Sequence, residues 1–280
     1  MVDGDSGDDA STAMSAGASK ERYGTLKWFE QQYGRDPSDP WGLTWRPSQR
    51  LRYQRVLDAV QALDEPLPRI MDVGCATGEF THLISRHVRS ATQVLGVDFV
   101  STAIERARRR FPDVRFTTES VFSLGARYQG QFDLVFCLEV LYYIEARERA
   151  AAIRSLHDAV REGGYVVFSS FVGPSPHFAP NEFLSLVATE FEVIRWELLH
   201  LRVISLIEKL GHRLRACMAG RGEARRARRQ GRRIRTLPWF AAVAIEKWSR
   251  HLGPLTSSHT LVLARAKADR EGGERGGTFG

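Results

Sequence analysis

The chain has 280 residues, of which 43% are hydrophobic and 26% charged, with a formal net charge of +7. This composition excludes the collagen-like, wholly disordered and membrane-spanning classes. The three cysteines are too few and too scattered for a disulfide framework or a zinc knuckle, and no apolar run approaches the ~20 residues of a membrane helix. Because the first residues also lack the parts of a signal peptide, we expect a cytoplasmic protein without a metal site.

The N-terminal part is predicted to be helical after a disordered tail. Residues 1–19 are mostly Ser, Gly, Ala and Asp, which cannot offset the entropy lost on ordering. A helix is expected over 20–33 and another over 50–63, separated by a turn-rich stretch. Prolines 66 and 68 end this region, so we expect residues 20–66 to form a separate N-terminal helical region.

Residues 67–198 alternate between short apolar strands and helices, which is the pattern of a parallel sheet wound with helices. Two glycines, at 163 and 164, are expected to end the helix that precedes the fifth strand. The predicted strands are 69–73, 93–98, 114–117, 132–137, 165–170 and 191–198, with helices at 78–87, 102–110, 146–160 and 180–188. A last strand lies in residues 256–267, and residues 268–280 are predicted to be a second disordered tail.

The segment 199–255 interrupts this alternation and carries the positive charge. It holds 14 Lys or Arg and three Glu, a net charge of +11, which leaves −4 for the rest of the chain. Two amphipathic helical stretches flank an arginine-rich run, residues 221–235. This run is either a solvated connector or a contact for anions such as lipid headgroups or nucleic acid. The aromatic residues of the flanking stretches favour a membrane surface or a lipid-like substrate over RNA.

A glycine-containing loop follows the first strand and reads Asp72-Val-Gly74-Cys75-Ala76-Thr-Gly78. The glycines allow a sharp turn and let a ligand lie against the backbone. Asp98 ends the next strand, where a carboxylate can accept both hydroxyls of a ribose. A dinucleotide loop would read G-x-G-x-x-G, and Asp72 would repel a pyrophosphate. The same charge favours a cofactor with an amino group and a sulfonium.

These residues resemble the class I S-adenosylmethionine-dependent methyltransferases. Three further motifs of that family follow in order: Phe132-Asp-Leu-Val135, Leu138–Ile144 and Arg161-Glu-Gly-Gly164. Glu139-Val-Leu-Tyr-Tyr143 and Asp39-Pro-Trp41 are more closely similar to the nodulation-type N-methyltransferases, which act on the amino group of a sugar. The resemblance implies an α/β fold with a doubly wound, mostly parallel seven-stranded, Rossmann-like sheet. Residues 20–66 would be an N-terminal helical lid, 67–198 the cofactor-binding core, and 199–255 a basic helical insertion before the last strand.

The resemblance also implies S-adenosyl-L-methionine as the cofactor and assigns its contacts. Asp72 and the loop from Gly74 to Gly78 would hold the methionine moiety, Asp98 the ribose and Phe99 the adenine ring. The stretch after the third strand departs from the family's Gly-Asp pair, so either Glu119 or Ser120 would bind the adenine amine. The full expected set is Trp41, Arg52, Asp72, Gly74, Cys75, Ala76, Gly78, Asp98, Phe99, Glu119, Ser120, Val121 and Leu138.

Three residues are candidates for the general base that would take a proton from the methyl acceptor: Glu139, Tyr143 and His177. Each has a simpler alternative, because Glu139 could hold its own loop, Tyr143 could pack in the core and His177 could lie on the surface. Trp41 could likewise pack in the core instead of lining the site.

The sequence therefore predicts a methyltransferase, N- or O-directed, that acts on an amine or hydroxyl of a small, sugar-containing metabolite. The alternatives are a lipid-linked or membrane-associated substrate, a catalytically silent cofactor-binding protein and, least favoured, nucleic acid. Base-modifying relatives carry an Asn/Asp-Pro-Pro-aromatic motif or a catalytic Cys where this chain has Leu138-Glu-Val-Leu141. We expect the insertion to form a helical, lid-like subdomain over the carboxyl ends of the strands. It would select the acceptor and touch either anionic lipid, at the inner face of the membrane, or a lipid-linked substrate.

Overall fold

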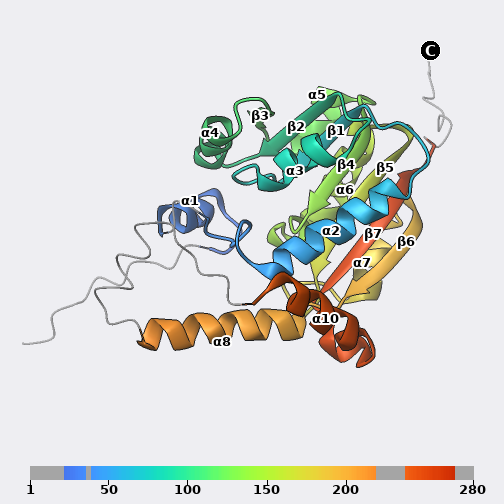
Figure 1. Cartoon of the computed structure of the whole chain (residues 1–280). Helices are drawn as coiled ribbons and strands as arrows, with labels where there is room; N and C mark the ends of the chain where they lie inside the picture. Colours follow the sequence, from blue (N-terminus) through green and yellow to red (C-terminus); the bar gives the residue numbers. More distant parts are fainter. Residues whose placement is uncertain (1–21, 36–38, 219–236, 269–280) are drawn as a thin grey trace, which may run out of the picture.

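The computed structural model describes residues 22–35, 39–218 and 237–268 (Figure 1). The two predicted tails, apart from Ala268, and the arginine-rich run lie outside these residues, as does the start of the first predicted helix. No helix of the described residues is long and apolar enough to cross a membrane.

In the described residues, seven strands form one sheet in the order β3-β2-β1-β4-β5-β7-β6. Strand β7 runs antiparallel to both of its neighbours, and the other pairs are parallel. The strands are β1 (Arg69–Val73), β2 (Gln93–Asp98), β3 (Arg115–Thr118), β4 (Phe132–Leu138), β5 (Val160–Phe171), β6 (Phe191–Leu199) and β7 (His259–Ala266). The predicted doubly wound, mostly parallel seven-stranded sheet is confirmed.

Helices cover both faces of the sheet. Successive residues of a strand point to opposite faces, so each strand contributes side chains to both helical layers. In β4, Val135 and Cys137 pack under α5, α6 and α7, whereas Leu134 and Phe136 pack under α2 and α3. The helices are α1 (Leu26–Arg35), α2 (Pro47–Gln61), α3 (Glu79–His87), α4 (Ser101–Arg110), α5 (Leu124–Tyr128), α6 (Arg149–Ala159), α7 (Pro180–Val187), α8 (Arg202–Met218) and α10 (Trp239–Arg250).

Most predicted boundaries differ from the structure by a few residues at most, and two of them differ by five or six. Helix α1 begins at Leu26 and not at residue 20. Strand β5 begins at Val160, where a helix end was expected, because Val160 pairs with Phe132 before the register shifts and resumes at Tyr165. Gly163, with φ +66°, allows this irregularity inside the strand, so the glycines do not precede the strand as predicted.

The order of the strands positions the site. The chain builds outward from β1 through β2 to β3 and then returns to the other side of β1 with β4. The loops that follow β1 and β4 therefore diverge, which is where open α/β sheets bind ligands. Because His259 of the antiparallel β7 pairs with Phe171 at the end of β5, the start of β7 reaches the same edge of the sheet.

The described helices of the insertion, α8 and α10, pack beside α2 (Figure 1). The buried carboxylate of Glu208 in α8 accepts hydrogen bonds from the backbone N–H (2.8 Å) and the hydroxyl (2.7 Å) of Ser48, in the first turn of α2. Glu246 of α10 pairs with Arg55, further along α2, at 3.1 Å. The insertion thus holds α2 at two points.

Candidate functional site

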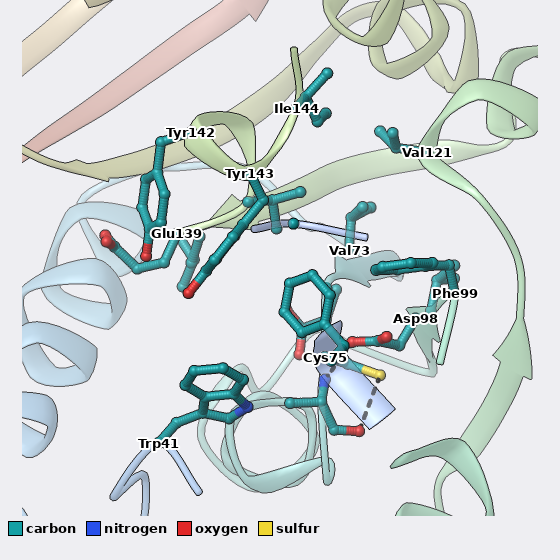
Figure 2. A pocket seen from close by; sticks show the side chains of 18 of the residues that line it. Trp41, Val73, Cys75, Asp98, Phe99, Val121, Glu139, Tyr142, Tyr143 and Ile144 are labelled. Atoms are coloured by element: carbon teal, nitrogen blue, oxygen red, sulfur yellow. Dashed lines mark hydrogen bonds between the residues drawn. The ribbon is translucent and has the colours of Figure 1, made fainter. Parts of the chain in front are cut away.

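A cavity of about 570 Å³ lies at the carboxyl ends of β1, β2 and β4 (Figure 2). All of the predicted site residues except Gly78 line it: Trp41, Arg52, Asp72, Gly74, Cys75, Ala76, Asp98, Phe99, Glu119, Ser120, Val121, Leu138, Glu139, Tyr143 and His177. No described residue of 199–255 lines the cavity, and the described helices of the insertion pack beside α2. Residues 219–236 lie outside the described residues, so the expected lid stays a prediction. An amphipathic stripe reveals that a helix has an apolar face but not which surface covers it.

The loop after β1 requires its glycines. Gly74 has φ +74°, and a Cβ there would lie 2.3 Å from Cγ2 of Val140. Gly78 has φ +85°, and a Cβ would meet the Phe116 ring at 2.7 Å. Gly78 therefore lets α3 begin close to the sheet and does not touch the cavity. Between them, Ala76 adopts φ +50°, a left-handed conformation that non-glycine residues rarely take.

Asp98 ties this loop to β2. Its two carboxylate oxygens accept the backbone N–H groups of Ala76 and Val100, each at 2.9 Å. Burial nevertheless raises the pKa of Asp98 to about 6, because the two N–H groups compensate the desolvation of the carboxylate only in part. Each oxygen accepts one of these bonds and has a second lone pair for a further donor.

Asp72 is the second buried carboxylate at this end of the cavity. The Thr81 hydroxyl donates to it at 2.6 Å, and burial raises its pKa to about 7. No cation among the described residues forms an ion pair with Asp72. Two buried carboxylates without a counter-ion, beside a glycine loop and the half-exposed Phe99 ring, fit a ligand that brings hydroxyl donors, a positive charge and a flat ring. An S-adenosylmethionine molecule has these groups.

The residues after β3 have partners of their own. Glu119 is paired with Arg127 at 3.0 Å and accepts the Ser123 hydroxyl at 3.1 Å. The Ser120 hydroxyl accepts the backbone N–H of Phe122 at 3.3 Å and caps a short turn. Both line the cavity with Val121, so the assignment of the adenine amine to Glu119 or Ser120 stays a prediction.

An aromatic wall closes the middle of the cavity. The Tyr143 ring contacts those of Tyr142 at 4.5 Å, Phe29 at 4.9 Å and Tyr23 at 5.1 Å between centroids. Trp41 lies at the same wall and donates through Nε1 to the Tyr33 hydroxyl at 3.3 Å. Burial keeps Tyr143 protonated by raising its pKa. Our sequence analysis did not identify the aromatic residues of 23–33 as site residues. Aromatic residues at helical spacing more often pack in a hydrophobic core than line a cavity.

Glu139 stands at the opposite end from Asp98, with Tyr143 between them (Figure 2). Its backbone has φ +61°, and its Oε1 accepts the Ser169 hydroxyl at 2.7 Å. Arg52 Nη1 lies 2.8 Å from the same oxygen, and His259 Nε2 lies 3.7 Å from Oε2.

The charge of this group is set by its neighbours. Burial alone would raise the pKa of Glu139, but the charges of His259 and Arg52 and the Ser169 hydrogen bond together lower it. Burial also lowers the pKa of His259 to about 4, so this imidazole is neutral at neutral pH. When His259 is neutral, the Arg52 charge and the Ser169 hydrogen bond are the contacts that favour the ionised form of Glu139.

The guanidinium of Arg52 is buried and incompletely satisfied. Its side chain lines the cavity, and neither Nε nor Nη1 has an aligned hydrogen-bond partner among the described residues. The approach of Nη1 to Glu139 is thus a charge contact without hydrogen-bond geometry. His177 packs its ring on Tyr142 and Phe171, burial lowers its pKa, and its buried Nδ1 has no partner in the described part of the chain. His259 was not predicted as a site residue, since no local sequence motif marks the first residue of β7.

Comparisons with known proteins agree with this geometry. Residues 70–164 match the family model described as a methyltransferase domain. The predicted resemblance to class I S-adenosylmethionine-dependent methyltransferases is confirmed for this part of the chain.

Relatives share the domain but extend beyond the aligned region. Nodulation protein S of Rhizobium tropici is 32% identical over 136 residues, which cover 47% of this chain and 55% of that protein. A ubiquinone biosynthesis O-methyltransferase of Albidiferax ferrireducens is 30% identical over 44% of this chain and 47% of its own length. The chain spans about half the length of these curated relatives.

Solved structures share the fold. The N-methyltransferase NodS from Bradyrhizobium japonicum, in complex with S-adenosyl-L-homocysteine, superposes with a TM-score of 0.56 at 18% identity. The match covers 85% of this chain and 98% of NodS. The [4+2]-cyclase SpnF superposes with a TM-score of 0.53 at 20% identity, over 76% of this chain and 80% of its own. Since one of the two is named for a different reaction, the fold alone does not assign the chemistry.

Proposed function

We propose that this chain binds S-adenosylmethionine and transfers its methyl group to an amine of a small, sugar-containing metabolite. The observation that supports this most directly is the pair of buried carboxylates on either side of a glycine loop, Asp72 and Asp98, which form no ion pair within the part of the chain that the structure describes. The similarity to proteins named nodulation protein S and N-methyltransferase NodS favours an amine over a hydroxyl.

Each part of the cavity has a role in this reaction. S-adenosylmethionine supplies a methyl group on a positively charged sulfur. Asp98 would bind the ribose hydroxyls, Asp72 the amino group of the methionine moiety, and Phe99 the adenine ring. The aromatic wall around Tyr143 and Trp41 excludes water and would hold the acceptor in line with the methyl group, which is the main requirement of such a displacement.

The predicted general bases differ in what they can do. Glu139 is a weak base because its pKa is lowered, but its carboxylate is a good hydrogen-bond acceptor for an amine N–H. Tyr143 remains a phenol at neutral pH and would orient the acceptor. Since His177 is neutral and its Nδ1 has no partner among the described residues, it is the best placed of the three to accept a proton.

Calorimetry with S-adenosylmethionine tests the cofactor. Wild-type protein should bind it, and Asp98→Ala should weaken binding at least tenfold, because two charge-assisted hydrogen bonds of roughly 1.5–3 kcal/mol each are lost. NAD titrated under the same conditions should bind more weakly. Tighter binding of NAD, or no binding of S-adenosylmethionine by folded wild-type protein, would refute the proposal.

The acceptor is tested with S-adenosylmethionine that carries a labelled methyl group. Amino sugars should accept the label, whereas the corresponding N-acetylated sugars, whose nitrogen has no free lone pair, should not. Equal labelling of neutral sugars that lack nitrogen would shift the assignment to O-methylation.

We further propose that residues 199–255 touch an anionic membrane surface. Leu206, Leu210 and Leu214 form a mostly exposed stripe along α8, and Phe240 and Trp248 of α10 are also exposed. These apolar side chains lie in the segment whose net charge is +11. Apolar residues on a strongly basic amphipathic helix are typical of binding to acidic lipid headgroups.

Co-sedimentation with phosphatidylserine-containing vesicles tests this contact. We expect binding that weakens as salt is added and is absent with pure phosphatidylcholine, because each basic residue near the surface contributes about 1 kcal/mol. Leu206→Ser with Leu210→Ser should reduce it, as should Gln in place of the arginines between 221 and 235. Binding of S-adenosylmethionine should be unchanged in both variants. If wild-type protein ignores anionic vesicles at low salt, the segment is a solvated connector.

A further inference from the structure

The sheet ends at β6, whose outer edge pairs with no other strand of the described residues (Figure 1). Such an edge presents a row of backbone N–H and C=O groups that can pair with a further strand, and natural proteins often protect it with lysine or proline. Strand β6 contains neither. A register shift between Val193 and Arg195 disturbs its first half, and the pairing with β7 is regular from Arg195 to Leu199.

Two large apolar side chains of β6 are exposed to solvent. Ile194 is 49% and Trp196 48% exposed, whereas Phe191 and Leu199 at the ends of the strand are buried. Covering a half-exposed tryptophan removes a large apolar area from water, which is favourable. The middle of β6 is therefore the part of the strand where a partner would bury most apolar surface.

Two residues of opposite charge flank Trp196. Arg195 and Glu197 stand opposite Leu263 and Leu261 of β7, so both side chains point to the face of the sheet that Trp196 does not share. Arg195 Nη2 lies 3.5 Å from Oε2 of Glu197, and both side chains are partly exposed. The regular part of β6 thus presents a tryptophan on one face and a positive and a negative charge on the other.

This order of side chains is complementary to itself. Two copies of β6 can pair antiparallel about a two-fold axis at Trp196, which places Arg195 of each copy opposite Glu197 of the other. The two tryptophan rings then meet at the axis, on the other face of the joined sheet. A register centred on Arg195 or on Glu197 would instead bring like charges opposite each other, which is unfavourable. The sequence of β6 therefore favours one register.

We propose that this chain forms a symmetric dimer with a second copy of itself through the outer edges of β6, in the register centred on Trp196. The self-complementary order of Arg195 and Glu197 is what identifies the partner as a second copy. None of these three residues lines the cavity, so the dimer does not depend on the proposed methyl transfer. A single pair of strands makes an interface smaller than the roughly 1,200 Å² of stable complexes, so we expect association that depends on protein concentration in the micromolar range.

Sedimentation velocity of the full chain, without lipid, tests the dimer. The sedimentation coefficient of wild-type protein should rise from that of a monomer to that of a dimer as the concentration is raised through the micromolar range. Trp196→Ser should weaken association about tenfold or more, because the apolar area and the ring pair at the axis are lost. Trp248→Ser is the matched control, since it removes an equally exposed tryptophan from α10, and it should leave association unchanged.

Two results of this experiment would overturn the proposal. Wild-type protein that stays monomeric at high micromolar concentration would show that a second copy does not occupy the edge of β6. Dimers that are lost with Trp248→Ser but kept with Trp196→Ser would show that the copies associate through the insertion.

Charge reversal at the two facing positions tests the register. Arg195→Glu and Glu197→Arg each place like charges opposite each other, so each single variant should be monomeric at concentrations where wild-type protein is a dimer. The double variant Arg195→Glu/Glu197→Arg restores the complementary order and should restore the dimer. An equimolar mixture of the two single variants should also associate, because every arginine then faces a glutamate of the other copy.

The double variant and the mixture separate charge repulsion from loss of folding, which circular dichroism of each variant also checks. Recovery of the dimer in both would support the register, since an unfolded single variant could not associate in the mixture. Single variants that dimerise as wild type does, or folded single variants that do not associate when mixed, would overturn the proposal.

Discussion

The carboxylates at the two ends of the cavity have pKa values shifted in opposite directions. At the end formed by the loop after β1, Asp72 and Asp98 are buried with hydrogen bonds but without an ion pair to any described residue. Burial raises their pKa values to about 7 and about 6. At the other end, Glu139 is also largely buried, yet His259, Arg52 and Ser169 lower its pKa.

This difference in pKa shift indicates which end of the cavity is suited to bind a charged ligand. A buried carboxylate without a counter-ion is unfavourable in the free protein, so a ligand that brings positive charge and hydroxyl donors relieves this cost on binding. A carboxylate that already has its cation gains less from a second one, and it serves better as a fixed hydrogen-bond acceptor. The first end suits the cofactor, and the second suits the acceptor.

The largest effect on stability is expected at the Glu139 end. Glu139→Gln leaves the Arg52 guanidinium buried without its carboxylate, and breaking a buried pair in this way costs about 3–5 kcal/mol. Urea denaturation should show a lower midpoint with an unchanged slope. The double variant with Arg52→Gln should recover much of the loss. A Glu139→Gln protein as stable as wild type would show that the ion pair does not hold this end together.

Asp72→Asn should lower the affinity for the cofactor without lowering the stability of the free protein. It removes a buried charge that has no counter-ion, so the stability of the free protein at pH 8 should be unchanged or higher. Affinity for S-adenosylmethionine should fall roughly 10- to 100-fold, as expected for one charge-assisted hydrogen bond of roughly 1.5–3 kcal/mol. Calorimetry and urea denaturation on the same protein check both parts. Loss of stability without loss of affinity would reverse the interpretation of this end.

The pH dependence of cofactor binding sharpens the comparison. The folded-state pKa of Asp72 is raised, so this group is protonated at pH 6 and ionised at pH 8. A ligand amino group that needs the ionised form should bind about tenfold more tightly at pH 8 than at pH 6, because the ionised fraction of a carboxyl with a pKa of about 7 rises about tenfold between these pH values. 5′-Methylthioadenosine, which lacks the amino acid part, should show a shallower dependence in calorimetry. Parallel curves for the two ligands would exclude Asp72 as the amino-group contact.

The smallest effect is expected at Cys75. Burial, with the nearby Asp98 and Asp72, raises the pKa of this thiol well above its usual range. A maleimide at pH 8 should leave the Cys75 peptide unlabelled in the native protein and label it after unfolding, as mass spectrometry would show. Cys75→Ala should change cofactor affinity less than about threefold, since a buried thiol acts as a small apolar filler. Rapid labelling of the native protein would mean that the loop opens.

The two ends also differ in how far the sequence revealed them. The cofactor end follows from one contiguous loop and the aspartate of the next strand, and its glycines are required by local geometry at Gly74 and Gly78. Glu139 was recognisable because it directly follows a buried strand. Its partners were not, since Arg52, Ser169 and His259 come from α2, β5 and β7, and no spacing in the sequence links them.

By itself the sequence determined the alternation of strands and helices, the loop at Gly74 and the position of Asp98, because these depend on hydrophobic periodicity and backbone conformation within a few residues. Only the tertiary structure decided that α8 and α10 pack beside α2, that α2 directs Arg52 onto Glu139, and that His259 completes this group. Those contacts depend on which apolar faces cover one another and which strand ends share an edge. Such long-range choices leave no local pattern in the chain.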